Sequence, residues 1–263
     1  MAIRKRWVIK AGSNMVCAGG PLLLRTWMQQ VSILRRKYNT EVVWVTSGAI
    51  AAASERAQRK AGKHRTLAEK QALSAIGQPL VMDLYNLALH ATGLLGAQVL
   101  LTYDDLANRV RRVNLKNTIE QLLTWDVVPV LNENDAVATE EIKFGDNDAL
   151  SAKAAALIGA DRLVILTDVI GLCDSDPRID ASAKRIANVD RIDASLLKTV
   201  TPVAGSAHGT GGMYSKLLAA QLAAKSRIDT WLMKGDLPSV LLESAEGRNP
   251  GTIVSSRGRW AAR

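Results

Sequence analysis

The stretch VVPVLNENDAVATEEIKFGDNDAL, Val127 to Leu150, decides how we interpret the fold. Its apolar start, Val127 to Leu131, predicts a buried strand, and Asp148 opens a predicted helix over Ala149 to Ile158. A strand that leads through a polar turn into a helix is the repeating unit of α/β proteins. The stretch therefore predicts one such unit, with polar groups at the carboxyl end of its strand.

The polar part of this stretch concentrates negative charge in a basic protein. It sets six carboxylates against a single lysine, Lys143: Glu133, Asp135, Glu140, Glu141, Asp146 and Asp148. Crowded carboxylates repel one another, so the run either lies in water as a solvated loop or faces a metal ion or an ammonium group. Amides interleaved with the acids favour a polar ligand: Asn132, Asn134 and Asn147. Between them, Ala136 to Phe144 is expected to form a small hairpin.

Strands and helices alternate along the rest of the chain. The predicted strands are Trp7 to Lys10, Glu41 to Thr46, Ala97 to Leu101, Val127 to Leu131, Leu163 to Leu166 and Thr230 to Met233. The predicted helices are Pro21 to Tyr38, an alanine-rich helix after Gly48, Leu67 to His90, one helix capped by Asp104 that ends near Asp126, Ala149 to Ile158 and Met213 to Lys225. We expect an α/β domain whose mainly parallel sheet has helices on both faces, and a tail without a further core element.

Composition narrows the class of protein. The chain has 263 residues, 48% of them hydrophobic, and a net charge of +9 that is spread along its length. No aromatic residues are interleaved with the basic clusters, so we expect a solvated basic surface and no nucleic-acid partner. Cys17 and Cys173 are too few for a metal site or a disulfide framework and indicate a reducing compartment. With no secretory signal or membrane span predicted, we expect a soluble cytoplasmic protein.

Polar residues recur where the predicted strands end. Lys10 with Gly12, Ser47 with Gly48, Asn132 to Asp135, and Thr167 with Asp168 each follow a strand, and ligands of open parallel sheets gather at that edge. The segment GTGGMYSK, Gly209 to Lys216, opens a helix with glycines but is neither a Walker A loop nor a dinucleotide-binding fingerprint. Two lysines, Lys10 and Lys216, together with glycine N–H groups and a carboxylate-bound Mg²⁺, would suit phosphoryl transfer. For each lysine the alternative is a solvated side chain.

Six segments carry a resemblance to the amino acid kinase family, and in particular to its members that phosphorylate the γ-carboxylate of glutamate. They are IKAGS (9–13), VTSGAIAAA (45–53), LAEKQALSAIGQ (67–78), NENDAVATEEIKFGDND (132–148), LTDVIGL (166–172) and GTGGMYSK (209–216). The resemblance runs in order from about residue 6 to about residue 254. It implies an α/β three-layer αβα sandwich and the reaction of ATP with L-glutamate to γ-glutamyl phosphate and ADP, the first step of proline biosynthesis.

The resemblance also implies a role for each matching residue. Lys10 and Lys216 would stabilise the transferring phosphoryl group, Asp148 would orient both lysines, and Gly12 and Gly48 would offer backbone N–H groups. L-Glutamate would be held by Ser47, Gly48, Asp135 and Asn147. ATP with Mg²⁺ would be held by Lys10, Gly12, Thr167, Asp168, Gly209, Thr210, Gly211, Gly212, Met213 and Lys216, and no side chain is assigned as a metal ligand.

Further expectations concern organisation and regulation. A single amino acid kinase domain, 1–263, would bind substrate through about 1–160 and nucleotide through about 161–263, without the C-terminal PUA domain that many relatives carry. Dimers or tetramers and feedback inhibition by L-proline are implied for the family. This sequence departs from the family pattern at Lys234-Gly235, where Asn-Gly is usual, and at Cys173, where tyrosine is usual; both positions bear on nucleotide binding.

Two other readings remain open. The protein could phosphorylate another acid, such as carbamate or aspartate, but EIKFGDND (141–148) argues against this. It could also be a catalytically silent metabolite sensor or RNA-binding protein on the same fold, which the charge of +9 would suit. Retention of Lys10, Lys216 and Asp148 argues against silence, because a sensor needs the pocket but not the groups for phosphoryl transfer.

Overall fold

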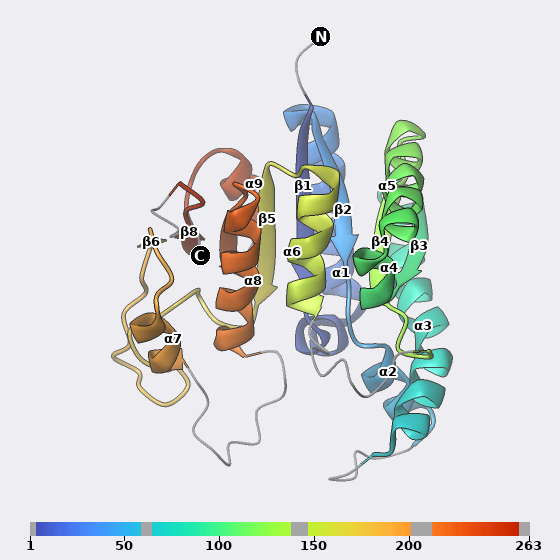
Figure 1. The fold of residues 1–263 in the computed structure, drawn as a ribbon, viewed down its shortest axis with the longest axis horizontal. Helices are drawn as coiled ribbons and strands as arrows, with labels where there is room; N and C mark the ends of the chain where they lie inside the picture. The colour runs from blue at the N-terminus through green and yellow to red at the C-terminus, as the bar shows by residue number, and fades with distance from the viewer. Residues whose placement is uncertain (1–3, 59–64, 138–146, 201–211, 258–263) are drawn as a thin grey trace.

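The computed structural model describes residues 4–58, 65–137, 147–200 and 212–257. Within them, one sheet of eight strands has the order β3-β4-β2-β1-β5-β7-β8-β6, and every neighbouring pair is parallel except β7 with β8 (Figure 1). The strands are β1 Lys5–Ala11, β2 Thr40–Val45, β3 Gly96–Leu101, β4 Val128–Glu133, β5 Arg162–Thr167, β6 Asn188–Val189, β7 Asp229–Lys234 and β8 Thr252–Val254. The predicted α/β class with a mainly parallel sheet is confirmed.

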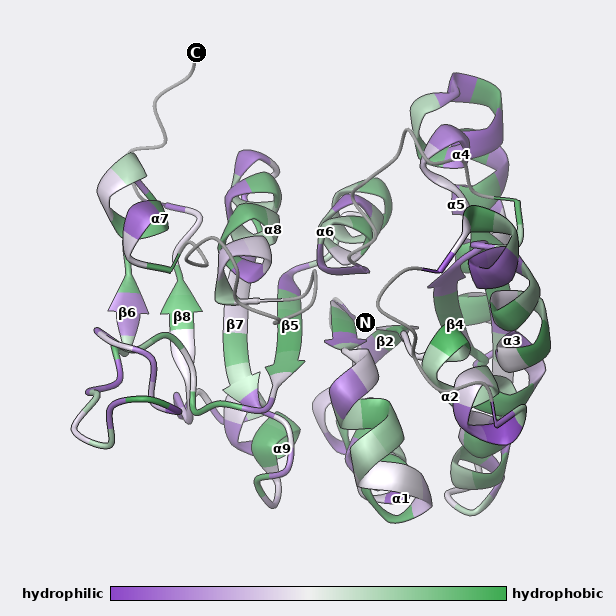
Figure 2. Cartoon of the chain, turned by 90° about the horizontal axis from the view of Figure 1, so that it is seen from below, coloured by the Kyte–Doolittle hydropathy of each residue, from purple (hydrophilic) through white to green (hydrophobic). Residues whose placement is uncertain are grey.

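Helices cover both faces of the sheet, as the view from below shows (Figure 2). One layer contains α4 Tyr103–Ala107, α5 Arg109–Thr124, α6 Asn147–Ile158, α7 Ala194–Val200 and α8 Met213–Lys225. The other contains α1 Ser13–Tyr38, α2 Ala49–Arg56, α3 Leu67–His90 and α9 Val240–Ala245. The three-layer αβα sandwich expected from the sequence is therefore confirmed.

Side chains along the central strands point alternately to the two faces of the sheet and pack into two separate hydrophobic cores. In β1, Val8 joins the cluster under α5, α6 and α8, while Trp7 and Ile9 join the cluster under α1, α3 and α9. Successive side chains of a strand point to opposite faces, so a strand covered on both faces must be apolar throughout. This explains why β1, β2, β4 and β5 read as nearly continuous Val, Ile, Leu and Trp.

Two predicted helices have different bounds. The helix predicted from Pro21 begins earlier, at Ser13, and Gly20 interrupts it with a positive φ of 57° directly before Pro21. Glycine accepts that backbone conformation, and proline favours the first turn of the helical piece that follows. The single helix predicted after Asp104 is two helices, α4 and α5, capped by the side chains of Thr102 and Asn108, so the assignment of Asp104 as cap was wrong.

The expectation that the tail adds nothing to the core was also wrong. Strand β8 pairs antiparallel with β7 and parallel with β6, and α9 buries Val240 and Leu241 against the second core. Strands of two and three residues are too short to show a period of two in the sequence. Most of the predicted hairpin, Ala136 to Phe144, lies outside the described residues.

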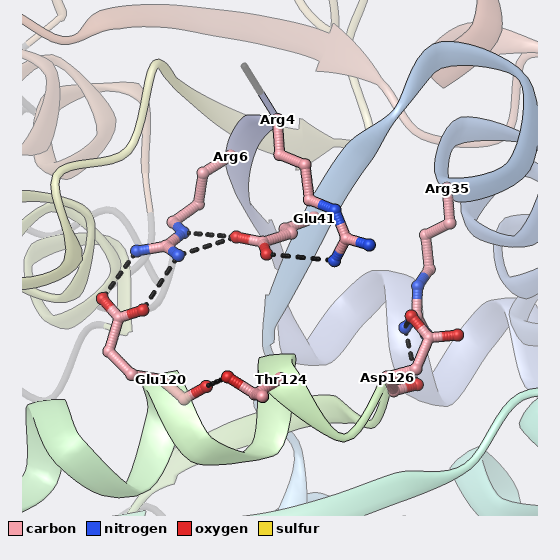
Figure 3. A network of polar contacts seen from close by, with 7 residues as sticks. All are labelled: Arg4, Arg6, Arg35, Glu41, Glu120, Thr124 and Asp126. Carbon is pink, nitrogen blue, oxygen red and sulfur yellow. Dashed lines mark hydrogen bonds and ion pairs between the residues drawn. The ribbon is translucent and has the colours of Figure 1, made fainter. Parts of the chain in front are cut away.

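A network centred on Arg6 joins several elements at the amino ends of the strands, the edge opposite the polar residues of the predicted site (Figure 3). Its guanidinium donates to Glu41 of β2 at 2.7 Å, to Glu120 of α5 at 2.7 Å and to the carbonyl of Ile158 at 2.8 Å. Arg6 is one residue from the start of β1, so the contacts tie β1, β2, α5 and α6 together. Planar bidentate contacts of this kind are stronger than single surface ion pairs.

Candidate functional site

Four central strands deliver polar residues to one edge of the sheet. Lys10 lies in register with Val45 of β2 and Ile165 of β5, one residue before β1 ends. Ser47 follows β2 after Thr46, Glu133 ends β4 and Thr167 ends β5. Because these strands are parallel neighbours, their carboxyl ends meet, and the edge predicted from the sequence is the one at which these residues gather.

A buried charge cluster occupies the centre of this edge. Lys10 Nζ lies 2.5 Å from Asp148 Oδ1, and Lys216 Nζ lies 3.2 Å from Asp148 Oδ2. Asp148 is 0% exposed and Lys10 2%. Ser215 Oγ donates a further hydrogen bond of 3.0 Å to Asp148. Among the described side chains, one carboxylate thus faces two buried ammonium groups, an arrangement that suits a site for an anion.

The helices explain how these residues converge. Asp148 lies in the first turn of α6, where the helix dipole favours a negative side chain, and Lys216 lies in the first turn of α8. The two helices pack side by side on the same face of the sheet (Figure 1). Their amino ends therefore point at the same place beside Lys10, and free N–H groups at helix starts add to the attraction for an anion.

Asn147, the neighbour of Asp148, holds a second group of polar residues together. Its amide nitrogen lies 2.6 Å from the carbonyl of Thr46, 2.9 Å from Ser47 Oγ and 2.7 Å from Asn132 Oδ1. The structure thus brings together Ser47 and Asn147, two of the side chains assigned to substrate. An amide nitrogen has only two hydrogens for these three acceptors, so one contact is free to be exchanged for a ligand.

Gln78 of α3 extends this amide network away from the edge. It accepts from Asn132 Nδ2 at 3.0 Å and donates to the carbonyl of Glu133 at 3.0 Å. No role was predicted for Gln78 from the sequence. The available signal was a polar pair four residues apart on one helix face, Ser74 and Gln78, which the structure shows to be buried among apolar residues such as Leu73 and Val81.

Two carboxylates at the end of β4 lie apart from the lysines. Burial, together with the smaller effect of the charge of Asp135, raises the pKa of Glu133 to about 7. Burial also raises the pKa of Asp135, an effect partly offset by the hydrogen bond of 3.2 Å that Ser74 Oγ donates to it. Both acids would ionise more easily beside a cation, so this end of the site suits an ammonium group.

The predicted glycine turns stand at helix starts. Gly12 precedes α1, and a Cβ atom added to it would lie 3.5 Å from Lys10 Nζ, so its backbone approaches the catalytic candidate closely. Gly48 precedes α2 with a φ of 106°, a conformation that favours glycine. Gly212 precedes α8 and Met213 is its first residue, whereas Gly209, Thr210 and Gly211 lie outside the described residues.

The remaining nucleotide candidates lie at the ends of β5 and β7. Thr167 Oγ1 donates to the carboxylate of Asp168 at 3.1 Å, and Asp168 is exposed. Lys234 is in register with Thr167 and pairs with Asp236 at 3.3 Å. Cys173 is buried, which raises the pKa of its thiol. The two positions that depart from the family pattern thus differ, because Lys234 adjoins the candidate residues and Cys173 is a buried thiol in the following turn.

Some site types have no representative in the described part of the chain. There, no group of three or more His, Cys, Asp and Glu side chains is placed to hold a metal ion. A search of the same residues found no helix with the length and apolar character needed to cross a bilayer. An exposed carboxylate such as Asp168 still fits Mg²⁺ that arrives on phosphates, since such ions keep water and take one or two carboxylates.

Comparison with known proteins agrees with this geometry. The profile of the amino acid kinase family matches residues 5–234. Glutamate 5-kinase of Alcanivorax borkumensis is 41% identical over 100% of this chain and 72% of its own length. The glutamate 5-kinases of Chromobacterium violaceum and Thermus thermophilus are 44% and 43% identical, and the chain spans 70% and 69% of them. On this match and on its three-layer fold, the chain belongs to the amino acid kinase family.

Proposed function

We propose that this protein transfers the γ-phosphoryl group of ATP to the γ-carboxylate of L-glutamate, giving γ-glutamyl phosphate and ADP, the first step of proline biosynthesis. The observation that carries the proposal is the buried Lys10–Asp148–Lys216 cluster, which places two ammonium groups at the carboxyl edge of the sheet. The choice of glutamate as substrate is supported by two relatives, 41% and 44% identical to this chain, that are named glutamate 5-kinase.

The reaction needs positioning and positive charge more than covalent chemistry. The γ-carboxylate of glutamate is ionised at neutral pH, so one of its oxygens attacks the γ-phosphorus while the bond to the β,γ-bridging oxygen breaks and ADP leaves. Negative charge on the transferring group and on the leaving oxygen meets the ammonium groups of Lys10 and Lys216. Asp148 holds both lysines in place through its two oxygens.

The amino acid would lie between the lysines and the acids of β4. We assign Asp135 to the α-ammonium group, and Ser47, Gly48 and Asn147 to the carboxylates. The raised pKa of Asp135 supports this, because a bound ammonium group would offset the burial that disfavours its ionised form. The exchangeable contacts of Asn147 provide a donor that can turn to the substrate.

The nucleotide would lie over β5 and the start of α8. Its phosphates would be held by Gly12, Thr167, Asp168, Met213 and the segment Gly-Thr-Gly-Gly at 209–212, and Asp168 would help to hold Mg²⁺. That ion, when bound, supplies positive charge to the phosphates. We thus assign about 1–160 to the amino acid and about 161–263 to ATP within one domain, and the free thiols Cys17 and Cys173 fit the reducing cytoplasm.

We also propose a homo-oligomer, dimer or tetramer. Strand β3 is at one edge of the sheet, and large apolar side chains are exposed on it and around it: Ile76 48%, Leu87 68%, Leu95 56% and Leu100 37%. An edge strand beside apolar surface is a ready place for a second copy of the chain. Sedimentation velocity of the protein and of Leu87→Glu tests this, with a monomeric wild type as the result that contradicts it.

The reaction is tested by trapping the product. Purified protein with Mg-ATP and hydroxylamine should give a hydroxamate from glutamate and not from aspartate or carbamate. Lys10→Ala should lower turnover by on the order of 10² or more, since one preorganised charge is lost. Tight RNA binding without any glutamate-dependent product would instead favour a silent sensor. Repeating the assay with L-proline shows whether proline inhibits the enzyme.

A further inference from the structure

A groove of about 580 Å³ opens on the outer surface of the helical layer that carries the catalytic helices. It lies where α4 and α5 face α6 and α8, and these helices cover one face of the sheet (Figures 1 and 2). Its apolar lining includes Leu106, Val113, Leu157 and Leu222. Val113 is 51% exposed, so an apolar surface is left in contact with water at this place.

Positive charge surrounds this apolar lining. Arg112 and Lys116 come from α5, Lys153 from α6 and Lys225 from α8, and none of the lining residues is acidic. Among the described residues, no carboxylate forms an ion pair with any of these four side chains. Four cations around one groove without a counter-charge favour an anionic occupant.

Lys153 is the most constrained of the four cations. Its Nζ lies 4.1 Å from the centre of the Tyr103 ring, and the side chain is only partly exposed. Partial burial removes some of the water around its ammonium group and so lowers the pKa of Lys153. An ammonium group that is partly desolvated and held over an aromatic ring binds an anion at a smaller desolvation cost than a freely hydrated lysine.

We propose that this groove binds a small organic anion, one that joins an apolar body to a carboxylate, sulfonate or phosphate head. The volume of about 580 Å³ falls in the range of small-molecule sites, roughly 300–1,000 Å³. A stable protein partner usually contacts about 20–30 residues a side, more than this groove offers. The site is distinct from the catalytic cluster, because Asp148 and Lys216 are buried on the inner side of α6 and α8.

The test compares two fluorescent probes that differ in charge. 8-Anilinonaphthalene-1-sulfonate carries the anionic head, whereas N-phenyl-1-naphthylamine has the same rings without it. Both are titrated into the full chain with saturating Mg-ATP, which fills the nucleotide site. We expect one sulfonate probe per chain, bound about tenfold or more tightly than the neutral probe, because a hydrogen bond to a charged group adds that much.

Three variants locate the binding. Lys153→Gln removes a central cation and should weaken the sulfonate probe about tenfold while leaving the neutral probe unchanged. Ala156→Trp, at an exposed lining position, should fill the groove and weaken both probes. Lys70→Gln removes the same charge from an exposed position of α3 and should change neither. Circular dichroism of each variant checks that the fold is retained.

Several results would overturn the proposal. Equal affinity for the two probes would show a merely apolar surface, and equal losses in Lys153→Gln and Lys70→Gln would show a general effect of net charge. Absence of sulfonate binding when Mg-ATP is saturating would place the probe in the nucleotide site. If Ala156→Trp lowers the number of subunits in sedimentation velocity, the groove is an interface between copies of the chain and not a ligand site.

Discussion

Substitutions in the Lys10–Asp148–Lys216 cluster should affect activity and stability differently. Three substitutions each remove one charge with little change of shape: Lys10→Met, Lys216→Met and Asp148→Asn. Either lysine variant leaves Asp148 paired with the other lysine. Asp148→Asn instead removes the carboxylate that both buried ammonium groups contact. The three variants should therefore differ in stability although all three should lose activity.

The contact distances give the magnitudes. At 2.5 and 3.2 Å and an effective dielectric constant of about 20, each attraction to Asp148 is about 5–7 kcal/mol before desolvation. Removing one lysine loses one attraction but also relieves several kcal/mol of desolvation and the repulsion between the lysines. The free energy of unfolding should change by about 1 kcal/mol or less. Asp148→Asn loses both attractions and keeps the repulsion, so we expect a loss of about 3–5 kcal/mol.

Urea unfolding followed by circular dichroism, in a buffer without phosphate or sulfate, measures the stabilities, and the hydroxamate assay measures turnover. The lysine variants should unfold near the wild-type midpoint and lose on the order of 10²–10³ in turnover. If Lys10→Met or Lys216→Met lost 3 kcal/mol or more, the lysines would be needed for folding and their charge would not be reserved for a substrate. Unchanged stability of Asp148→Asn would refute the pairing itself.

Three more predictions concern the surroundings of the site. Arg6→Met should lower the free energy of unfolding by about 3 kcal/mol with near-normal turnover, because it removes the partner of Glu120 and leaves Glu41 with only the exposed Arg4. Arg4→Met, which loses one exposed contact of 3.5 Å with Glu41, is the control and should cost less than about 1 kcal/mol in the same urea titration. Glu133→Gln should be as stable as the wild type near pH 4.5 and more stable at pH 8, by at most about 3 kcal/mol. The reason is that the folded pKa of Glu133, about 7, lies above the ordinary 4.5, so the wild type loses the stability linked to the bound proton as pH rises through 7. Equal free energies of unfolding for the two proteins at pH 8 would contradict this. Gln78→Leu should raise the KM for glutamate on the order of tenfold with a smaller change in kcat, and an unchanged KM would mean that Asn132 and Asn147 keep their positions without it.

The sequence predicted the long elements and failed on the short ones. Strands β1 and β5 contain the apolar runs Trp7 to Ile9 and Leu163 to Leu166, and α8 carries an alanine-rich pattern, so composition and period were enough to predict them. The strands β6 and β8 gain their backbone hydrogen bonds only from each other and from β7, which is tertiary information. The start of α1 was missed because Gly20 and Pro21 look like a helix boundary when only the local sequence is considered.

The site shows a similar division. Resemblance assigned roles to Lys10, Asp148 and Lys216, but physical reasoning on the sequence alone suggested only the two lysines. Asp148 and Lys216 are 68 positions apart in the sequence and come into contact because α6 packs on α8, which no local sequence pattern reveals. Gln78 was missed for the same reason, because its partner Asn132 is 54 positions away. Glu140, Glu141 and Lys143 lie outside the described residues, so the part of the acidic stretch they form keeps no assigned role.

The neighbours Asn147 and Asp148 give a physical basis for choosing glutamate over aspartate. Asn147 contacts Ser47 in the group assigned to the amino acid, and Asp148 holds the lysines assigned to the phosphoryl group, so one turn of α6 sets the spacing between them. Aspartate is shorter by one methylene, and held by the same groups its side-chain carboxylate would fall on the order of 1 Å short of the phosphorus. Misplacement of that size costs roughly 10² in rate. Discrimination should therefore appear mainly in kcat, and aspartate should bind and compete with glutamate while giving little hydroxamate.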